Sequence, residues 1–154
     1  MQLRKEYDRK TFNGVIQVLL VDDHAMVRQG LRAILENYSD VHVVAEAGDG
    51  RQAIEAVRTL RPHLVVMDIN MPAMDGIEAT AFIKQEYPDT IVVGLSFNAT
   101  KEHREAIIKA GAVDLITKEA AVEQLHDSIV MAMALSASFL STALSPGQTG
   151  PSTL

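Results

Sequence analysis

The sequence predicts an α/β domain in which five parallel strands alternate with five helices. Short apolar runs recur along the chain without polar alternation, which is typical of strands that are buried on both faces of a parallel sheet. Between these runs, apolar residues recur at helical spacing. Strict alternation of this kind implies right-handed crossovers, with helices covering both faces of the sheet.

Each element follows from its local pattern. Strands are expected over residues 15–21, 41–47, 64–68, 91–95 and 113–117. Two helices are indicated by apolar residues at helical spacing, namely Val27, Leu31, Ile34 and Leu35 in the first and Ala53, Ile54, Val57 and Leu60 in the second. Three more helices are expected over residues 77–86, 101–110 and 119–135. We expect the doubly wound, flavodoxin-like (βα)5 order 2-1-3-4-5, whose switch point lies between the first and third strands.

Length and composition predict one domain. With 154 residues, of which 47% are hydrophobic, the chain can build one core. We expect an N-terminal extension over 1–14, a folded domain over 15–136, and a linker or disordered tail over 137–154, where Ser, Pro and Gly accumulate. The net charge of -6 argues against direct binding of DNA, and the absence of cysteine excludes thiolate chemistry. With no apolar run of membrane-spanning length, a soluble cytoplasmic protein is expected.

Acidic residues are expected at neighbouring strand ends. Asp22 and Asp23 follow the first strand, and Asp68 ends the third. The predicted strand order places these ends together, at the edge of the sheet where ligands bind. Carboxylates in one crevice repel one another unless a cation binds them, and their oxygen ligands favour Mg²⁺. A carboxylate nucleophile beside Mg²⁺ suits phosphoryl transfer, for which Lys118 and Ser96, each at its own strand end, could supply a cation and a hydroxyl.

The same residues have ordinary structural interpretations. Asp22 or Asp23 could cap the helix that follows them. Asp68 could cap the turn before Pro72. Most serine and lysine side chains are simply solvated. Their joint placement at the ends of separate strands favours a functional site.

These features resemble the receiver domains of two-component response regulators, over about residues 15–135. The matching elements are the acidic pair, Asp68 in Met-Asp-Ile-Asn-Met-Pro-Ala-Met-Asp-Gly, Ser96 and Lys118. The resemblance implies that Asp68 is the phosphoacceptor and that the acidic pair and Asp68 bind Mg²⁺ together with the backbone carbonyl of Asn70. It also implies that Ser96 is the switch hydroxyl and Lys118 the counter-ion of the phosphate. Such a receiver modifies itself and is not a turnover enzyme.

The wording Asp-Asp-His, Ala-Gly-Ala and Thr-Lys-Glu-Ala is similar to the LuxR/FixJ (NarL-like) subfamily. This resemblance implies a transcription regulator that receives its phosphoryl group from a sensor histidine kinase and reaches DNA only through an output domain. We expect that output domain to be absent from this chain, which is then either a fragment of a longer regulator or a stand-alone receiver. A homodimer is expected to form through the helices at 101–110 or 119–135.

Two residues depart from the pattern of the family. Leu115 stands where most receivers carry an aromatic residue, and it has no ring to swing behind Ser96. Phe97 stands where a small residue usually follows the switch hydroxyl, and we expect it to crowd the approach of phosphate. Both departures support an alternative function, a phosphorylation-independent module for protein interaction or dimerisation.

Overall fold

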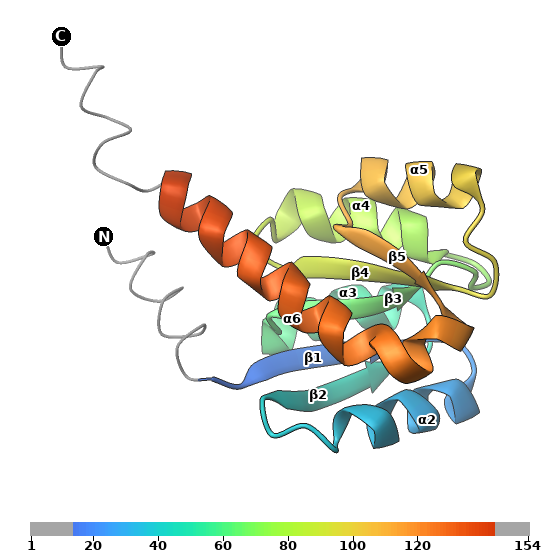
Figure 1. Cartoon of the computed structure of the whole chain (residues 1–154). Coiled ribbons are helices and arrows are strands. Elements are labelled where there is room, and N and C mark those ends of the chain that lie inside the picture. The colour runs from blue at the N-terminus through green and yellow to red at the C-terminus, as the bar shows by residue number, and fades with distance from the viewer. Residues whose placement is uncertain (1–13, 144–154) are drawn as a thin grey trace, which may run out of the picture.

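The computed structural model describes residues 14–143, and the side chains of residues 14–136 (Figure 1). Its five strands form one parallel sheet in the order β2-β1-β3-β4-β5, which confirms the predicted fold class and strand order. The strands are β1 (Ile16–Val21), β2 (Val41–Ala47), β3 (Leu64–Asp68), β4 (Ile91–Ser96) and β5 (Asp114–Thr117). Nearly all of the expected extension over 1–14, and the end of the expected tail, lie outside the described residues, so the domain boundaries stay predictions.

The helices cover both faces of the sheet. They are α2 (Ala25–Leu35), α3 (Gly50–Leu60), α4 (Gly76–Glu86), α5 (Lys101–Ala110) and α6 (Lys118–Ala143). One face of the sheet is covered by α2 and α6, and the other by α3, α4 and α5 (Figure 1). This arrangement is the one that right-handed crossovers produce when the chain winds outward in two directions from β1.

Two hydrophobic cores result, one on each face, and β3 contributes to both. Because side chains alternate along a strand, Leu64 and Val66 pack into one core while Val65 and Met67 pack into the other. The first core is completed by residues of α2 and α6, among them Leu31, Leu35, Leu125 and Ile129. The second is completed by residues of α3, α4 and α5, among them Val57, Ile83 and Ile107. Every residue of β3 is buried, which explains its uninterrupted apolar run.

Four helices begin at a side-chain cap, but α2 does not; in α6 the Ala120 N–H donates to Thr117 Oγ1 at 3.0 Å. Asp49, Asp75 and Thr100 each accept a hydrogen bond from a backbone N–H in the first turn of α3, α4 and α5. The residue before α2 is His24, and no side chain caps that helix. Instead, Asp22 Oδ1 accepts a hydrogen bond from the His24 N–H at 2.8 Å, which closes the turn between β1 and α2. The acidic pair is therefore not used as a helix cap.

The last helix is longer than the sequence predicts. We expected its end near residue 135, where serine and threonine become frequent, but α6 continues to Ala143. Serine and threonine are only weakly unfavourable in a helix, and no Gly or Pro occurs between Lys118 and Pro146. The final turns of α6 project away from the rest of the domain (Figure 1). Within the described residues, no helix is both long enough and apolar enough to cross a membrane.

The start of α4 lies so close to the end of β3 that only glycine fits at residue 76. A Cβ atom on Gly76 would lie 2.0 Å from the carbonyl oxygen of Asp68 and 2.8 Å from Ile69 Cα. Both are backbone atoms, which cannot rotate out of the way. The contact thus fixes the loop that follows Asp68.

We predict that Gly76→Ala lowers the free energy of unfolding by about 3 kcal/mol or more, because overpacking against backbone forces the chain to shift. Gly30→Ala is the matched control: Gly30 lies exposed in α2, and an added Cβ meets nothing within 4 Å. That change should stabilise the protein by up to about 1 kcal/mol, since alanine is the better helix former. Urea denaturation of both variants measures the difference. Equal stability of the two variants would contradict the close approach.

Candidate functional site

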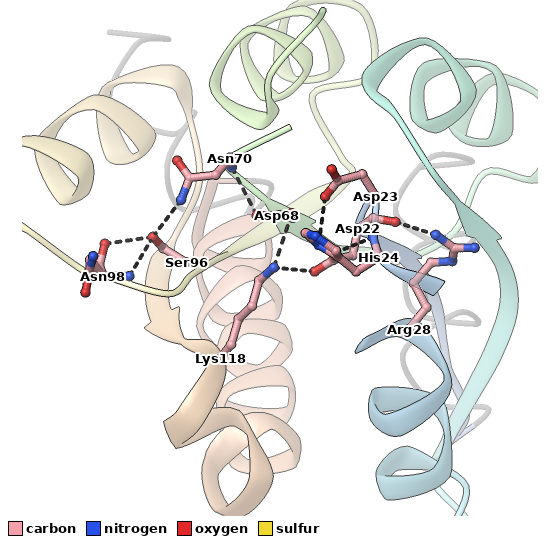
Figure 2. A network of polar contacts seen from close by, with 9 residues as sticks. All are labelled: Asp22, Asp23, His24, Arg28, Asp68, Asn70, Ser96, Asn98 and Lys118. Atoms are coloured by element: carbon pink, nitrogen blue, oxygen red, sulfur yellow. Dashed lines mark hydrogen bonds and ion pairs between the residues drawn. The ribbon is translucent and has the colours of Figure 1, made fainter. Parts of the chain in front are cut away.

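The structure brings the acidic residues and the lysine together at the carboxyl end of the sheet (Figure 2). Asp22 and Asp23 follow β1, and Asp68 is the last residue of the neighbouring strand β3. Ser96 ends β4, and Lys118 directly follows β5. All five predicted side chains therefore surround one crevice, because parallel strands end at the same edge.

Lys118 bridges two of the carboxylates. Its Nζ lies 2.7 Å from Asp22 Oδ2 and 3.3 Å from Asp68 Oδ2. The Lys118 side chain is 6% exposed, and those of Asp22 and Asp68 are 1% and 0% exposed. Charges this deeply buried need a partner of opposite sign, because water does not solvate them. The lysine thus offsets part of the repulsion between the two acids.

The Asp68 carboxyl is held by the loop that follows it. The Asn70 N–H donates to Asp68 Oδ1 at 3.0 Å. Burial, and to a smaller extent the nearby Asp22 charge, raise the pKa of Asp68, which lies at about 6. The Asn70 hydrogen bond and the Lys118 charge act in the opposite direction, but they do not cancel the effect of burial. Near neutral pH, Asp68 is therefore ionised at a cost, and a further positive charge would stabilise it.

The residues present fit a hard divalent cation. Ligand atoms of Asp22, Asp23, His24 and Asp68 all lie within 4.8 Å of one another. Three buried oxygens, Asp22 Oδ2, Asp23 Oδ1 and Asp68 Oδ2, have no hydrogen-bond partner among the described residues, although Lys118 Nζ lies within ion-pair distance of the two Oδ2 atoms. Carboxylate oxygens gathered in this way are the ligands that Mg²⁺ prefers. A role for the Asn70 carbonyl as an additional ligand stays a prediction.

The Ser96 hydroxyl is buried and is engaged with its own loop. Ser96 Oγ donates to the Asn98 carbonyl oxygen at 2.7 Å, and the Asn98 N–H lies 3.2 Å from Ser96 Oγ. The Asn70 side-chain Nδ2 also donates to Ser96 Oγ at 3.2 Å. In Figure 2 this group points away from Lys118. To contact a group bound at Asp68, the hydroxyl would first have to leave the Asn98 carbonyl.

Two aromatic rings border the crevice. Lys118 Nζ lies 4.3 Å from the centroid of the Phe97 ring, which is a cation–π contact. The His24 ring stands edge-on to Phe97, with the centroids 6.5 Å apart. His24 Nδ1 also lies 3.3 Å from Asp22 Oδ1 and 3.1 Å from Asp23 Oδ1. The sequence pointed to Phe97 only through its departure from the family pattern, and nothing in the spacing showed that its ring meets that of His24.

Arg28 also belongs to this network and carries no sequence signal. It lies in the first turns of α2, and its guanidinium reaches the backbone of Asp22 (Figure 2). An arginine on an amphipathic helix is usually a solvated residue, so the pattern alone gives no reason to place it at the site.

We predict that Asp68→Asn stabilises the Mg²⁺-free protein in a pH-dependent manner. An acid whose pKa rises on folding, here from 3.8 to about 6, contributes stability that is fully present below the unfolded value and is lost as the pH rises through the folded value. The variant has no charge to bury, so its free energy of unfolding at pH 7 should exceed that of the unmodified protein by about 1–3 kcal/mol. At pH 4 the difference should nearly vanish.

Urea denaturation at both pH values gives the measurement. The exposed Asp127 on α6 supplies the control, because Asp127→Asn changes the same group in water and should alter stability little. An Asp68→Asn effect that is the same at pH 4 and pH 7 would contradict the raised pKa.

Comparison with known proteins identifies the family. Residues 18–130 match the model of the response regulator receiver domain. The chain is 41% identical over 115 residues to the response regulator protein VraR of Staphylococcus aureus, a match that covers 74% of this chain and 54% of VraR. It is 38% identical over 115 residues to the transcriptional regulatory protein LiaR of Bacillus subtilis, covering 75% of this chain and 54% of LiaR.

Solved structures agree. A two-component response regulator of the LuxR family from Aurantimonas superimposes with a TM-score of 0.75 and 32% identity, covering 78% of this chain and 86% of that one. The chain spans about half the length of the curated relatives it matches. With the acidic crevice, the strand order and these matches, the chain belongs to the receiver domains of two-component response regulators, and its relatives include members of the LuxR family.

Proposed function

We propose that the chain is a phosphorylation-dependent switch in which Asp68 accepts a phosphoryl group from a sensor histidine kinase. The observation that carries this proposal is the position of Asp68: its carboxylate is buried at the end of β3, between a lysine and two further acids. A carboxylate so placed is a positioned nucleophile with charged groups on either side. Few structural roles would call for this concentration of buried charge.

The transfer is an in-line displacement at phosphorus. Asp68 Oδ1 already accepts the Asn70 N–H, so Oδ2 is the oxygen available to attack. A bond forms between this oxygen and phosphorus while the phosphorus–nitrogen bond of a phosphohistidine breaks, and the departing histidine nitrogen keeps the electron pair. Lys118, 3.3 Å from Oδ2, is placed to pair with an oxygen of the transferred group.

Asp22, Asp23 and Asp68 would hold Mg²⁺, with the Asn70 carbonyl as a further ligand. When bound, the ion would neutralise charge on the phosphoryl oxygens and on the crowded carboxylates. Exclusion of water and orientation of the carboxyl group depend on residues of this chain. Burial around Asp68 limits the access of water, and the Asn70 N–H keeps the carboxyl group oriented.

A phosphoryl group on Asp68 would offer new acceptors to Ser96 and Lys118. Because Ser96 Oγ is bonded to the Asn98 carbonyl, its movement toward the phosphate would alter the loop between β4 and α5. We propose that this change favours a homodimer through α5 or α6, where Ile108, Val122 and Met131 are exposed apolar side chains. Because relatives such as LiaR are transcriptional regulatory proteins, we include control of transcription through a DNA-binding output domain in the proposal.

The direct test is to incubate the full chain with acetyl phosphate and Mg²⁺ and to locate the added mass by peptide mass spectrometry. We predict one phosphoryl group on Asp68, and none when Mg²⁺ is chelated or when Asp68→Asn replaces the nucleophile. Asp127 is an exposed acid on α6, and the Asp127→Asn variant should take up one phosphoryl group, as the chain without substitutions does.

Two results would count against the proposal. Modification of the Asp68→Asn variant would place the phosphoryl group elsewhere. No modification under any condition would instead favour the phosphorylation-independent module that Phe97 and Leu115 suggest.

We predict that Phe97→Ala speeds formation of the acyl phosphate, its hydrolysis, or both. The ring is 62% exposed and lies over Lys118 Nζ, so it covers the path to the lysine. Losing a contact of about 0.5–1 kcal/mol corresponds to roughly a two- to fivefold change in rate. Radiolabelled phosphoryl transfer followed over time measures both rates. Phe82→Ala is the control, because Phe82 is likewise a partly exposed phenylalanine, 45% exposed on α4. Unchanged rates for Phe97→Ala would contradict the prediction.

A further inference from the structure

Glu46 of β2 holds two arginines of α2 side by side. Arg28 Nε donates to Glu46 Oε1 at 2.9 Å, and Arg32 Nε donates to Glu46 Oε2 at 2.7 Å. The arginines are four residues apart and so lie on the same face of α2. Their hydrogen bonds and charges lower the pKa of Glu46, with Arg32 as the larger cause. Both guanidinium groups therefore meet an ionised carboxylate at neutral pH.

Only one of the two arginines continues toward the acidic crevice. Arg28 Nη1 donates a short hydrogen bond to the main-chain carbonyl of Asp22 (Figure 2). Arg32 has no contact with the acidic pair among the interactions of the described residues, although it shares Glu46 with Arg28. The two side chains thus share Glu46, and Arg28 alone has the contact with the Asp22 backbone.

The Asp22 carbonyl lies where the sheet no longer supplies a partner. The pairing of β1 with β2 ends at Val21 and Ala47, one residue earlier. The Asp22 N–H still donates to the carbonyl of Ala47 in β2, at 3.1 Å. The Asp22 backbone is therefore held by β2 through its N–H and by Arg28 through its carbonyl. A carbonyl at a strand end without such a donor would be free to reorient.

We propose that Arg28 is a positioning residue for the cation site: aimed by Glu46, it clamps the Asp22 carbonyl and so sets the direction in which the Asp22 and Asp23 carboxylates face. The inference rests on the proposed function, because it assumes that these carboxylates bind Mg²⁺. Arg28 itself contacts no carboxylate of the crevice in the contacts of the described residues. Partners that orient the ligands of a metal commonly change metal affinity about 10–100-fold when removed.

Charge alone would produce the opposite effect. A guanidinium near a cation site repels the cation, so removing a positive charge should tighten Mg²⁺ binding slightly. Arg28→Met and Arg32→Met each remove one positive charge, and each takes one partner from Glu46. The pair is therefore matched for charge and for the loss at Glu46. Any difference between the variants reports the contact with the Asp22 carbonyl.

The experiment measures Mg²⁺ affinity of the full chain by isothermal titration calorimetry, with thermal unfolding of the metal-free protein measured in parallel. We expect Arg28→Met to weaken Mg²⁺ binding about tenfold or more, and Arg32→Met to leave it within about twofold. The amide NMR signals of Asp22 and Asp23 should shift in Arg28→Met before any metal is added, and not in Arg32→Met. A purely structural role would lower the melting temperature of both variants without separating their affinities.

Arg28→Lys serves as the second variant and decides the matter if Arg28→Met does not fold. A single ammonium keeps the charge but cannot reach both Glu46 and the Asp22 carbonyl in the forked manner of arginine, so Mg²⁺ binding should again be weak. Unchanged affinity in the folded Arg28 variant, or equal weakening by Arg32→Met, would overturn the inference alone. If the unmodified chain bound no Mg²⁺, the metal site of the proposed function would fail together with it.

Discussion

Two carboxylates and one ammonium share a buried crevice, and the remaining features of the site follow from the need to balance them. Asp22 and Asp68 are almost fully buried, and Lys118 lies within ion-pair distance of both. One positive charge cannot neutralise two buried acids and the partly exposed Asp23 beside them, so negative charge is left over. The raised pKa of Asp68 reflects this imbalance together with burial. The excess negative charge of this pocket favours the binding of a cation.

The loop between β4 and α5 is the element through which a change at this crevice can reach the surface. The Asn98 carbonyl accepts the Ser96 hydroxyl and lies 2.9 Å from Nδ1 of His103, in the first turn of α5. Movement of Ser96 would therefore disturb a contact that α5 shares. Leu115 is buried beside Gly94 and offers no ring that could follow the hydroxyl inward. In this protein the backbone of the β4–α5 loop, rather than an aromatic side chain, connects Ser96 to the start of α5.

Most of the fold could be predicted because it depends on local patterns and on general rules of chain topology. Buried strands require apolar runs, strict alternation requires a parallel sheet, and the strand order then places the ends of β1 and β3 side by side. Asp22, Asp23, Asp68 and Lys118 could be placed in one crevice for the same reason, since each stands at a strand end. The length of α6 was not predictable from composition, because serine and threonine weaken a helix without ending it.

The amino-acid sequence by itself determined which chemical groups stand at which strand ends, and hence that a negatively charged crevice would form. Only the tertiary structure decided how those groups are oriented. Arg28 meets Glu46 across 18 positions of the chain, and Ser96 turns toward Asn98 rather than Asp68. Side-chain direction depends on partners that folding brings from other elements, and no periodicity or spacing encodes those partners.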